Sequence, residues 1–179
     1  QSEELYALAL DALLAEQPSL QIDHPVVKYC EVLGDLESWH TGRKEIEAAF
    51  EARLERLRKL KANFSEKADR ERIRRDLEAR LPKVRSFSWW SLGMATLAEF
   101  VKEEDTPDNL VRARHIARDG QTAYPDAIGG KRCLYIVKSI EAPSFKIEAM
   151  AQDNLKRASI GIVYDNLTEG HRSAVDPRA

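Results

Sequence analysis

The chain has 179 residues, of which 43% are hydrophobic and 32% are charged, with a formal net charge of −2. This composition indicates a globular protein with a highly charged surface and excludes a disordered chain. The near-neutral charge gives no sign of a nucleic-acid partner, and no apolar run reaches the roughly 18 residues that a membrane span needs.

The chain begins at Gln1, and no basic or apolar leader precedes the first predicted element. We therefore expect a processed product or a part of a longer protein, with removal of a secretory signal left open.

Apolar residues at helical spacing predict seven helices. The predicted helices span residues 3–16, 24–40, 43–62, 66–81, 86–104, 108–124 and 129–141. Helix-ending signals separate them, chiefly Pro18, Thr41-Gly42, Pro82 and Pro125. In the 24–40 helix the residues that carry the apolar period are Val26, Tyr29, Cys30, Leu33, Leu36 and Trp39.

Residues 43–81 differ from the rest because they contain 13 basic and 9 acidic residues. Their apolar seam in the first helix consists of Ile46, Ala49, Phe50, Leu54, Leu57 and Leu60. We expect an antiparallel helical hairpin with Ser65 as the second N-cap, and one bent helix is the alternative. So thin a seam on so charged a body predicts a hairpin that protrudes or packs on one side only.

After Pro143 the apolar period changes from helical spacing to alternation, over residues 144–150 and 157–167. This predicts two strands, a pair that is marginal in water by itself, followed by a tail that frays. The predicted fold class is therefore mainly α: helical hairpins or a tetratricopeptide-like helical repeat, with a short C-terminal β-strand pair. We divide the chain into a charged helical segment (1–82), tetratricopeptide-like helices (83–142) and the strands with their tail (143–179).

The Gly129-Gly130-Lys131 sequence invites comparison with a phosphate-binding loop. Such a loop needs a glycine five residues before the Gly-Lys pair and a Ser or Thr after it. This chain has Pro125 and Arg132 at those positions, and a helix instead of a strand before them. We therefore interpret the pair as a turn that opens a helix.

The other candidates for chemistry have simpler interpretations. The four histidines, at positions 24, 40, 115 and 171, lack the spacing of metal ligands, and no nucleophile motif is present. Cys30 and Cys133 are expected to be small buried side chains, with a disulfide as the alternative. The basic sequence RLERLRKLK at 53–61 is expected to be a solvated helix face, because glutamates interrupt it.

Residues 89–125 resemble a tetratricopeptide repeat with an enlarged turn. Trp89, Leu92 and Gly93 match its first helix, while Ala113, Ala117, Gly120 and Pro125 fit the second helix and its end. Small residues at such positions allow close helix packing. The pattern predicts that Trp89 fills the gap between the two helices, against Ala113 and Ala117.

Residues 110–167 are similar to a junction in large bacterial alpha-2-macroglobulin-like proteins. The similarity lies in Pro125, Gly129, Gly130, Lys131, Cys133, in the Ile140-Glu141-Ala142 sequence, and in the VYDNL strand. It implies an N-terminal helical region that leads into the first macroglobulin-type β domain of a periplasmic or secreted protein. Neither cysteine lies in a thioester motif, so this region carries none of that family's reactive chemistry.

These observations favour a non-catalytic scaffold or protein-interaction region of a larger bacterial envelope protein. No catalytic, cofactor-binding or metal-binding residue is assigned, and the expected partner is the rest of the parent chain or another protein. The candidate protein-binding surface consists of Phe87, Trp89 and Trp90. The alternatives are an independent helical adaptor or effector-type domain and, less favoured, an enzyme whose site the sequence does not reveal.

Overall fold

The structure, a computed structural model, describes residues 25–149 and 160–165, with side chains over residues 25–143. The predicted helix at 3–16 and the C-terminal tail lie outside the described residues. The chain divides into two compact units, residues 1–136 and 137–179, which are treated separately below.

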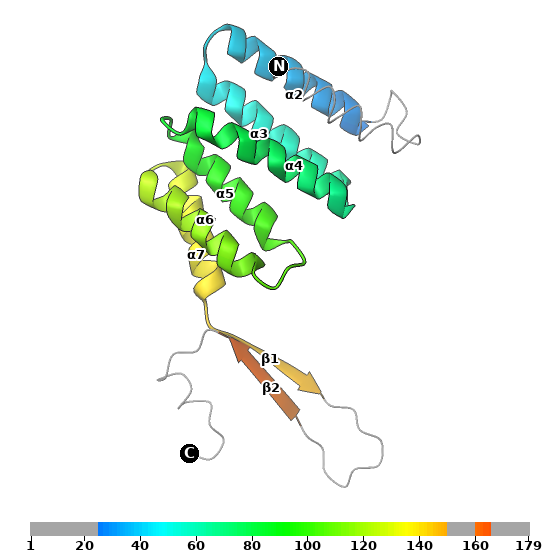
Figure 1. Ribbon diagram of the computed structural model, residues 1–179, viewed down its shortest axis with the longest axis vertical. Helices are drawn as coiled ribbons and strands as arrows, with labels where there is room; N and C mark the ends of the chain where they lie inside the picture. The colour runs from blue at the N-terminus through cyan, green and yellow to red at the C-terminus, as the bar shows by residue number, and fades with distance from the viewer. Residues whose placement is uncertain (1–24, 150–159, 166–179) are drawn as a thin grey trace. The chain divides into compact units, whose positions relative to one another are not determined.

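The described part of the first unit is helical, as the sequence predicts (Figure 1). The elements are α2 (Pro25–Gly42), α3 (Ile46–Asn63), α4 (Lys67–Arg80), the 3-10 helix η1 (Leu81–Val84), α5 (Trp89–Lys102), α6 (Asn109–Ala123) and α7 (Ile128–Glu141). The last residues of α7, 137–141, belong to the second unit. The mainly α fold class is therefore confirmed. The predicted cap Ser65 is wrong by one position, since Glu66 is the N-cap residue of α4 and makes no side-chain cap hydrogen bond.

Local sequence explains where α2 begins and ends. Pro25 occupies its first position, where the missing N–H is not needed, and Gly42 is its last residue. The turn that follows places Lys44 at a φ of 62°. The N–H of Glu45 donates to the carbonyl of His40 at 3.0 Å and closes this turn before α3 begins.

Helix α3 lies inside the first unit, where it contacts α2, α4 and α5 (Figure 1). Its buried residues are Ala49, Phe50, Ala52, Arg53, Leu54, Arg56, Leu57 and Leu60. The expectation that the charged hairpin protrudes or packs on one side is therefore wrong for α3. Ile46, which the sequence placed in the seam, is exposed.

Helices α5 and α6 form the second closely packed pair, and small residues let them approach. Ala113 and Ala117 of α6 are fully buried, as the sequence predicts. A Cβ on Gly120 would lie 2.8 Å from Cβ of Met94 and 2.6 Å from Sγ of Cys133. These positions have no room for a larger side chain, so the spacing of small residues determines the packing here.

In the second unit, β1 (Ser144–Ala149) and β2 (Ile160–Asp165) pair antiparallel. The register places Phe145 opposite Tyr164 and Ile147 opposite Ile162. Within the described residues these two strands form a two-stranded sheet.

Candidate functional site

The Gly129-Gly130 pair lies in the first turn of α7, where the helix meets other backbone. A Cβ on Gly129 would lie 2.1 Å from the backbone nitrogen of Leu92, and one on Gly130 would lie 1.8 Å from the carbonyl oxygen of Tyr124. Real Cβ atoms do not approach backbone this closely. The pair therefore serves close packing of α7 on α5 and on the end of α6, and Lys131 beside it is exposed.

The predicted aromatic surface is divided between the interior and the exterior. Trp90 is 8% exposed, and its ring lies 6.3 Å from that of Tyr124. Trp89 is half-buried, and its Nε1 donates to Oε2 of Glu51 in α3 at 3.1 Å. Trp90 is thus the core tryptophan, and Trp89 turns toward α3. Phe87, which precedes α5, is also half-buried.

The tetratricopeptide-like pattern placed Gly93 at the contact with the second helix. In the structure a Cβ on Gly93 would lie 2.7 Å from Leu81 and 2.8 Å from Phe50. Gly93 therefore allows α5 to approach α3 and η1, and this detail of the prediction is corrected.

The basic stripe at 53–61 is not a solvated face, and that prediction is wrong. Arg53 is 2% exposed; it donates from Nε to Glu37 at 2.8 Å and from a terminal nitrogen to Asp76 at 3.2 Å. Arg56 is also buried and donates to the other Glu37 oxygen at 2.7 Å. Acidic side chains of α2 and α4 thus form ion pairs with the two arginines, and these pairs allow α3 to bury charged side chains.

Burial dominates the electrostatics of this network. It raises the pKa of Glu37, against the opposing effect of the hydrogen bond and charge of Arg56. It also lowers the pKa of Arg53 to about 9, against the favourable charge of Asp76. The guanidinium stays protonated at neutral pH, so charged hydrogen bonds link α3 to α2 and to α4.

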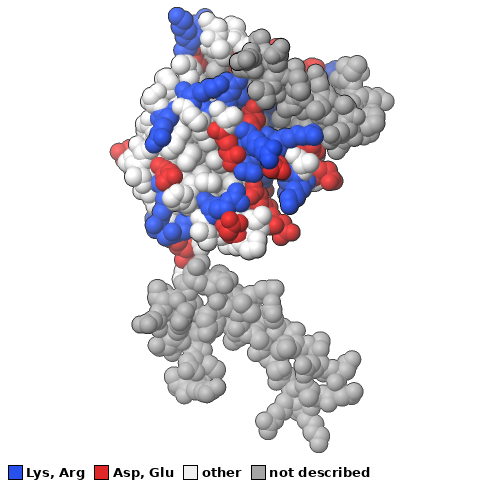
Figure 2. All heavy atoms as spheres, viewed as in Figure 1, with Lys and Arg blue, Asp and Glu red and all other residues white. Residues whose placement is uncertain are grey.

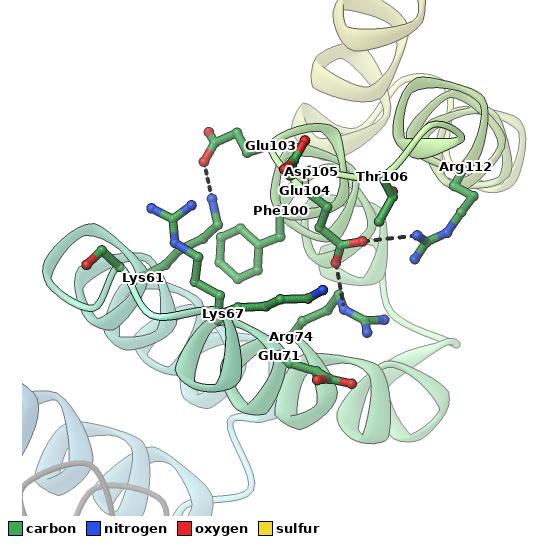
Figure 3. A pocket seen from close by; sticks show the side chains of 12 residues that line it. Lys61, Lys67, Glu71, Arg74, Phe100, Glu103, Glu104, Asp105, Thr106 and Arg112 are labelled. Carbon is green, nitrogen blue, oxygen red and sulfur yellow. Dashed lines mark hydrogen bonds and ion pairs between the residues drawn. The ribbon is translucent and has the colours of Figure 1, made fainter. Parts of the chain in front are cut away.

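Lys61, the last residue of the basic stripe, lines a pocket of about 490 Å³ (Figure 3). The pocket lies between the end of α3, the start of α4 and the end of α5. Its lining residues are Lys61, Ser65, Lys67, Arg70, Glu71, Arg74, Phe100, Glu103, Glu104, Asp105, Thr106 and Arg112. Phe100 is buried, and the ammonium of Lys61 lies 5.0 Å from its ring centre.

Most of the charge in this pocket is already paired. Lys61 donates to Glu103, and Glu104 accepts from Arg112 at 3.0 Å while lying 2.9 Å from Nε of Arg74 (Figure 3). Such pairs in partly exposed positions stabilise the walls modestly. The hydroxyl of Thr106 is buried with no hydrogen-bond partner among the described residues. The pocket offers polar contacts but no paired nucleophile and base.

Both cysteines are free and buried, as expected for small core side chains. The Cys133 thiol donates to the carbonyl of Ser91 at 3.4 Å. Burial raises the pKa of Cys30 and raises that of Cys133 to about 12. Neither thiol is activated as a nucleophile.

Helices α2 and α7 each expose apolar side chains along one side, and the sequence did not identify either group as a surface. On α2 the exposed residues are Tyr29, Val32, Leu36 and Trp39, which we call the α2 stripe. The sequence had placed Tyr29, Leu36 and Trp39 on the inner face of this helix, which is incorrect. On α7, Ile128 and Tyr135 are each 73% exposed, with the exposed Lys131 between them; these three form the α7 row.

Spacing alone contained a signal for both surfaces. The α2 stripe repeats at intervals of three, four and three residues, and the α7 row at three and four, so each lies along one side of its helix. Elsewhere on the helical unit Figure 2 shows basic and acidic side chains interspersed. Leu110 is exposed on α6.

Within residues 25–143, no group of three or more His, Cys, Asp or Glu side chains is arranged to hold a metal ion. No helix in the described part of the chain is long and apolar enough to cross a membrane. Comparison with known proteins found no matching protein family, no matching curated protein and no matching solved structure.

Proposed function

We propose that this chain is a non-catalytic helical scaffold that binds another protein through the α7 row. The observation that carries the proposal is the exposure of Ile128 and Tyr135 seven residues apart on one side of α7. Tyrosine is enriched in protein interfaces, so a row that combines an exposed tyrosine and an exposed isoleucine on one side of a helix is a candidate binding surface. Lys131 lies between the two, so the partner is a protein segment that presents apolar side chains together with a carboxylate.

A rigid base supports this use of α7. The Gly129 contact with α5 holds one end of the helix, and Arg132 forms two hydrogen bonds to Glu99 at 3.0 and 2.9 Å. The row therefore projects from a helix whose inner face is fixed. A binding site on a fixed element loses little conformational entropy when it is occupied.

The arrangement of α5 and α6 supports a tetratricopeptide-like repeat as the architecture of this scaffold. Ala113, Ala117 and Gly120 occupy the close contact between helices, as that repeat requires. Gly93 and Trp89 depart from the pattern, because both contact the α3 side. We therefore propose a helical stack of the same kind, with its own arrangement around α3.

We also propose that the chain belongs to a larger bacterial alpha-2-macroglobulin-like protein of the periplasm or the secreted fraction. The β1–β2 pair supports this, since a two-stranded sheet is marginal by itself and further strands would complete it. The parent gene tests the proposal: codons after residue 179 should encode a β domain. A stop codon there would favour an independent helical adaptor.

Peptide selection tests the binding surface. Random peptides selected on the full chain should be enriched in carboxylates and large apolar residues, and Tyr135→Asp should weaken their binding at least tenfold. Val111→Asp is the matched control, because Val111 is 70% exposed on α6 outside the row. Selected peptides that bind both variants as they bind the parent chain would refute the α7 row as the binding surface.

A further inference from the structure

The pocket lined by Lys61 and Phe100 is a second candidate site, separate from the α7 row. No residue of that row belongs to its lining, and its volume of about 490 Å³ lies within the range of small-molecule sites. The lining contains five basic and four acidic residues. Which of these charges lack partners decides the kind of ligand that fits.

Most of the acidic side chains in the pocket are bound to basic ones. Glu103 and Glu104 pair with basic residues of the same lining, and Glu71 accepts from Arg75 outside it at 2.5 Å. Asp105, the remaining acid, is exposed on the loop after α5. A cationic ligand would therefore have to displace basic side chains from most of these carboxylates.

Two basic side chains of the pocket, Lys67 and Arg70, have no carboxylate partner among the described residues. Both are exposed, and they lie three positions apart on α4, so they extend from the same side of that helix. Nε of Arg70 donates a long hydrogen bond of 3.4 Å to the carbonyl oxygen of Phe64, and the terminal nitrogens remain available. Lys67 and Phe100 reach into the pocket from facing sides (Figure 3). The two cations can therefore meet on one anionic group of a ligand.

The same end of the pocket offers further hydrogen-bond donors. Ser65 and Lys67, on either side of the N-cap residue Glu66, both line it, so the first turn of α4 borders the pocket. The Glu66 side chain makes no cap hydrogen bond, so no N-cap side chain covers the N–H groups of this turn. Asp69 of the same turn is buried and lies 3.6 Å from Arg72, and neither of these two residues lines the pocket.

We propose that this pocket binds a small molecule through a phosphate group, which Lys67, Arg70 and the first N–H groups of α4 hold together. A phosphate monoester carries about −1.5 to −2 charges at neutral pH, so it satisfies two cations better than one carboxylate does. Arg70 suits this group, because a guanidinium donates two parallel hydrogen bonds to phosphate. The N–H groups and the dipole at the start of a helix also favour an anion.

The rest of the ligand is a compact group with an apolar face. The pocket is larger than a phosphate group, and Phe100 supplies an aromatic wall that faces Lys67 (Figure 3). The hydroxyl of Thr106, which is buried without a hydrogen-bond partner among the described residues, adds a polar contact in the same lining. Phenyl phosphate is the simplest probe that contains both an aromatic ring and a phosphate monoester.

Titration of the full chain with phenyl phosphate, followed by amide chemical shifts in NMR, tests the proposal. Binding should be saturable, and the largest shifts should fall within residues 65–70. Lys67→Ala and Arg70→Ala should each weaken binding by about tenfold or more, because each removes a charged hydrogen bond to the phosphate. Lys83→Ala is the matched control, since Lys83 is an exposed lysine of η1 outside the pocket, and it should leave the affinity unchanged.

Two further probes separate the parts of the ligand. Inorganic phosphate should bind at the same residues but more weakly than phenyl phosphate, because it leaves the space beside Phe100 empty. Benzoate should bind about tenfold more weakly than phenyl phosphate or worse, since its carboxylate carries a single charge. Circular dichroism verifies that each variant is folded before its affinity is compared.

Four results would overturn the proposal. The first is the absence of saturable binding of phenyl phosphate, and the second is binding that neither Lys67→Ala nor Arg70→Ala weakens. The third is an equal loss of affinity in Lys83→Ala, which would assign the effect to general surface charge. The fourth is binding of benzoate or inorganic phosphate as tight as that of phenyl phosphate, which would exclude an esterified phosphate as the preferred ligand.

Discussion

Arg53 and Glu37 form an ion pair in the interior of the helical unit, with Nε of Arg53 donating to Oε1 of Glu37 at 2.8 Å. The Glu37 carboxylate also accepts from Arg56, so one acid from α2 serves two buried guanidinium groups of α3. A buried charge that loses its partner is strongly destabilising, whereas the intact pair contributes little net stability. Removal of one partner should therefore change the free energy of unfolding far more than the intact network contributes to it.

Replacement of Glu37 tests this view. Glu37→Ala should lower the free energy of unfolding by about 3–5 kcal/mol, because two buried guanidinium groups lose the carboxylate that they share. Glu31→Ala is the control, since Glu31 is an exposed acid on the same helix, and it should change stability by less than about 0.5 kcal/mol. Urea denaturation measures both, and equal losses would show that the pair carries no special cost.

The same arginines mark a limit of sequence analysis. Prolines and glycines mark the helix ends clearly, so every described α-helix was predicted with its ends within about three residues, while the 3-10 helix η1 was not predicted. Hydrophobic periodicity also found most of the core. It could not find Arg53 and Arg56 there, because burial of a charge depends on partners from α2 and α4 that are distant in sequence.

The candidate site was predictable only in part, for two further reasons. Trp89 and Trp90 are neighbours about 100° apart on a helix, so the period allowed either to be the core residue. The exposed residues of α2 share the helical period with its buried residues, and a period does not say which of two apolar faces is covered. Tertiary packing decides both questions.

The two tryptophans should differ in their effect on stability. Trp90→Ala should cost about 3–5 kcal/mol, because Trp90 is buried against Tyr124 and its loss leaves a cavity. Trp89→Ala should cost about 1–2 kcal/mol, since it removes a half-buried ring and one hydrogen bond to Glu51. The denaturant midpoints of the two variants measure these losses of stability. A larger loss for Trp89→Ala than for Trp90→Ala would support the repeat pattern's prediction that Trp89 is the core residue.

The buried Cys133 thiol should make stability depend on pH under alkaline conditions. Burial raises its pKa from the ordinary value of 9.0 to about 12. Between these values the unfolded chain releases the proton while the folded chain keeps it, so rising pH favours unfolding. The contribution of this group falls by up to about 1.4 kcal/mol per pH unit in that window and is constant below pH 9.

Comparison with Cys133→Ala isolates this effect, because the other titrating groups are shared. From pH 8 to pH 10 the stability difference between the parent chain and Cys133→Ala should shift by about 1.4 kcal/mol in favour of the variant. Unfolding by urea at several pH values measures the difference. A difference that stays constant over this range would mean that the thiol ionises equally in the folded and unfolded chains.

Gly129 should tolerate no side chain, for a reason unrelated to any ligand. An added Cβ would lie 2.1 Å from the backbone nitrogen of Leu92 in the first turn of α5, and the backbone of a packed helix cannot move aside as a flexible side chain can. Gly129→Ala should therefore lower the free energy of unfolding by about 2 kcal/mol or more, even though alanine favours a helix by about 1 kcal/mol over glycine. Gly42→Ala is the matched control, since nothing lies within 4 Å of its added Cβ, and it should be neutral or slightly stabilising.

Thermal and urea unfolding of Gly129→Ala and Gly42→Ala measure the difference in stability. If Gly129→Ala were as stable as the parent chain, α7 would not pack on the α5 backbone, and the rigid base proposed for the α7 row would be lost with it.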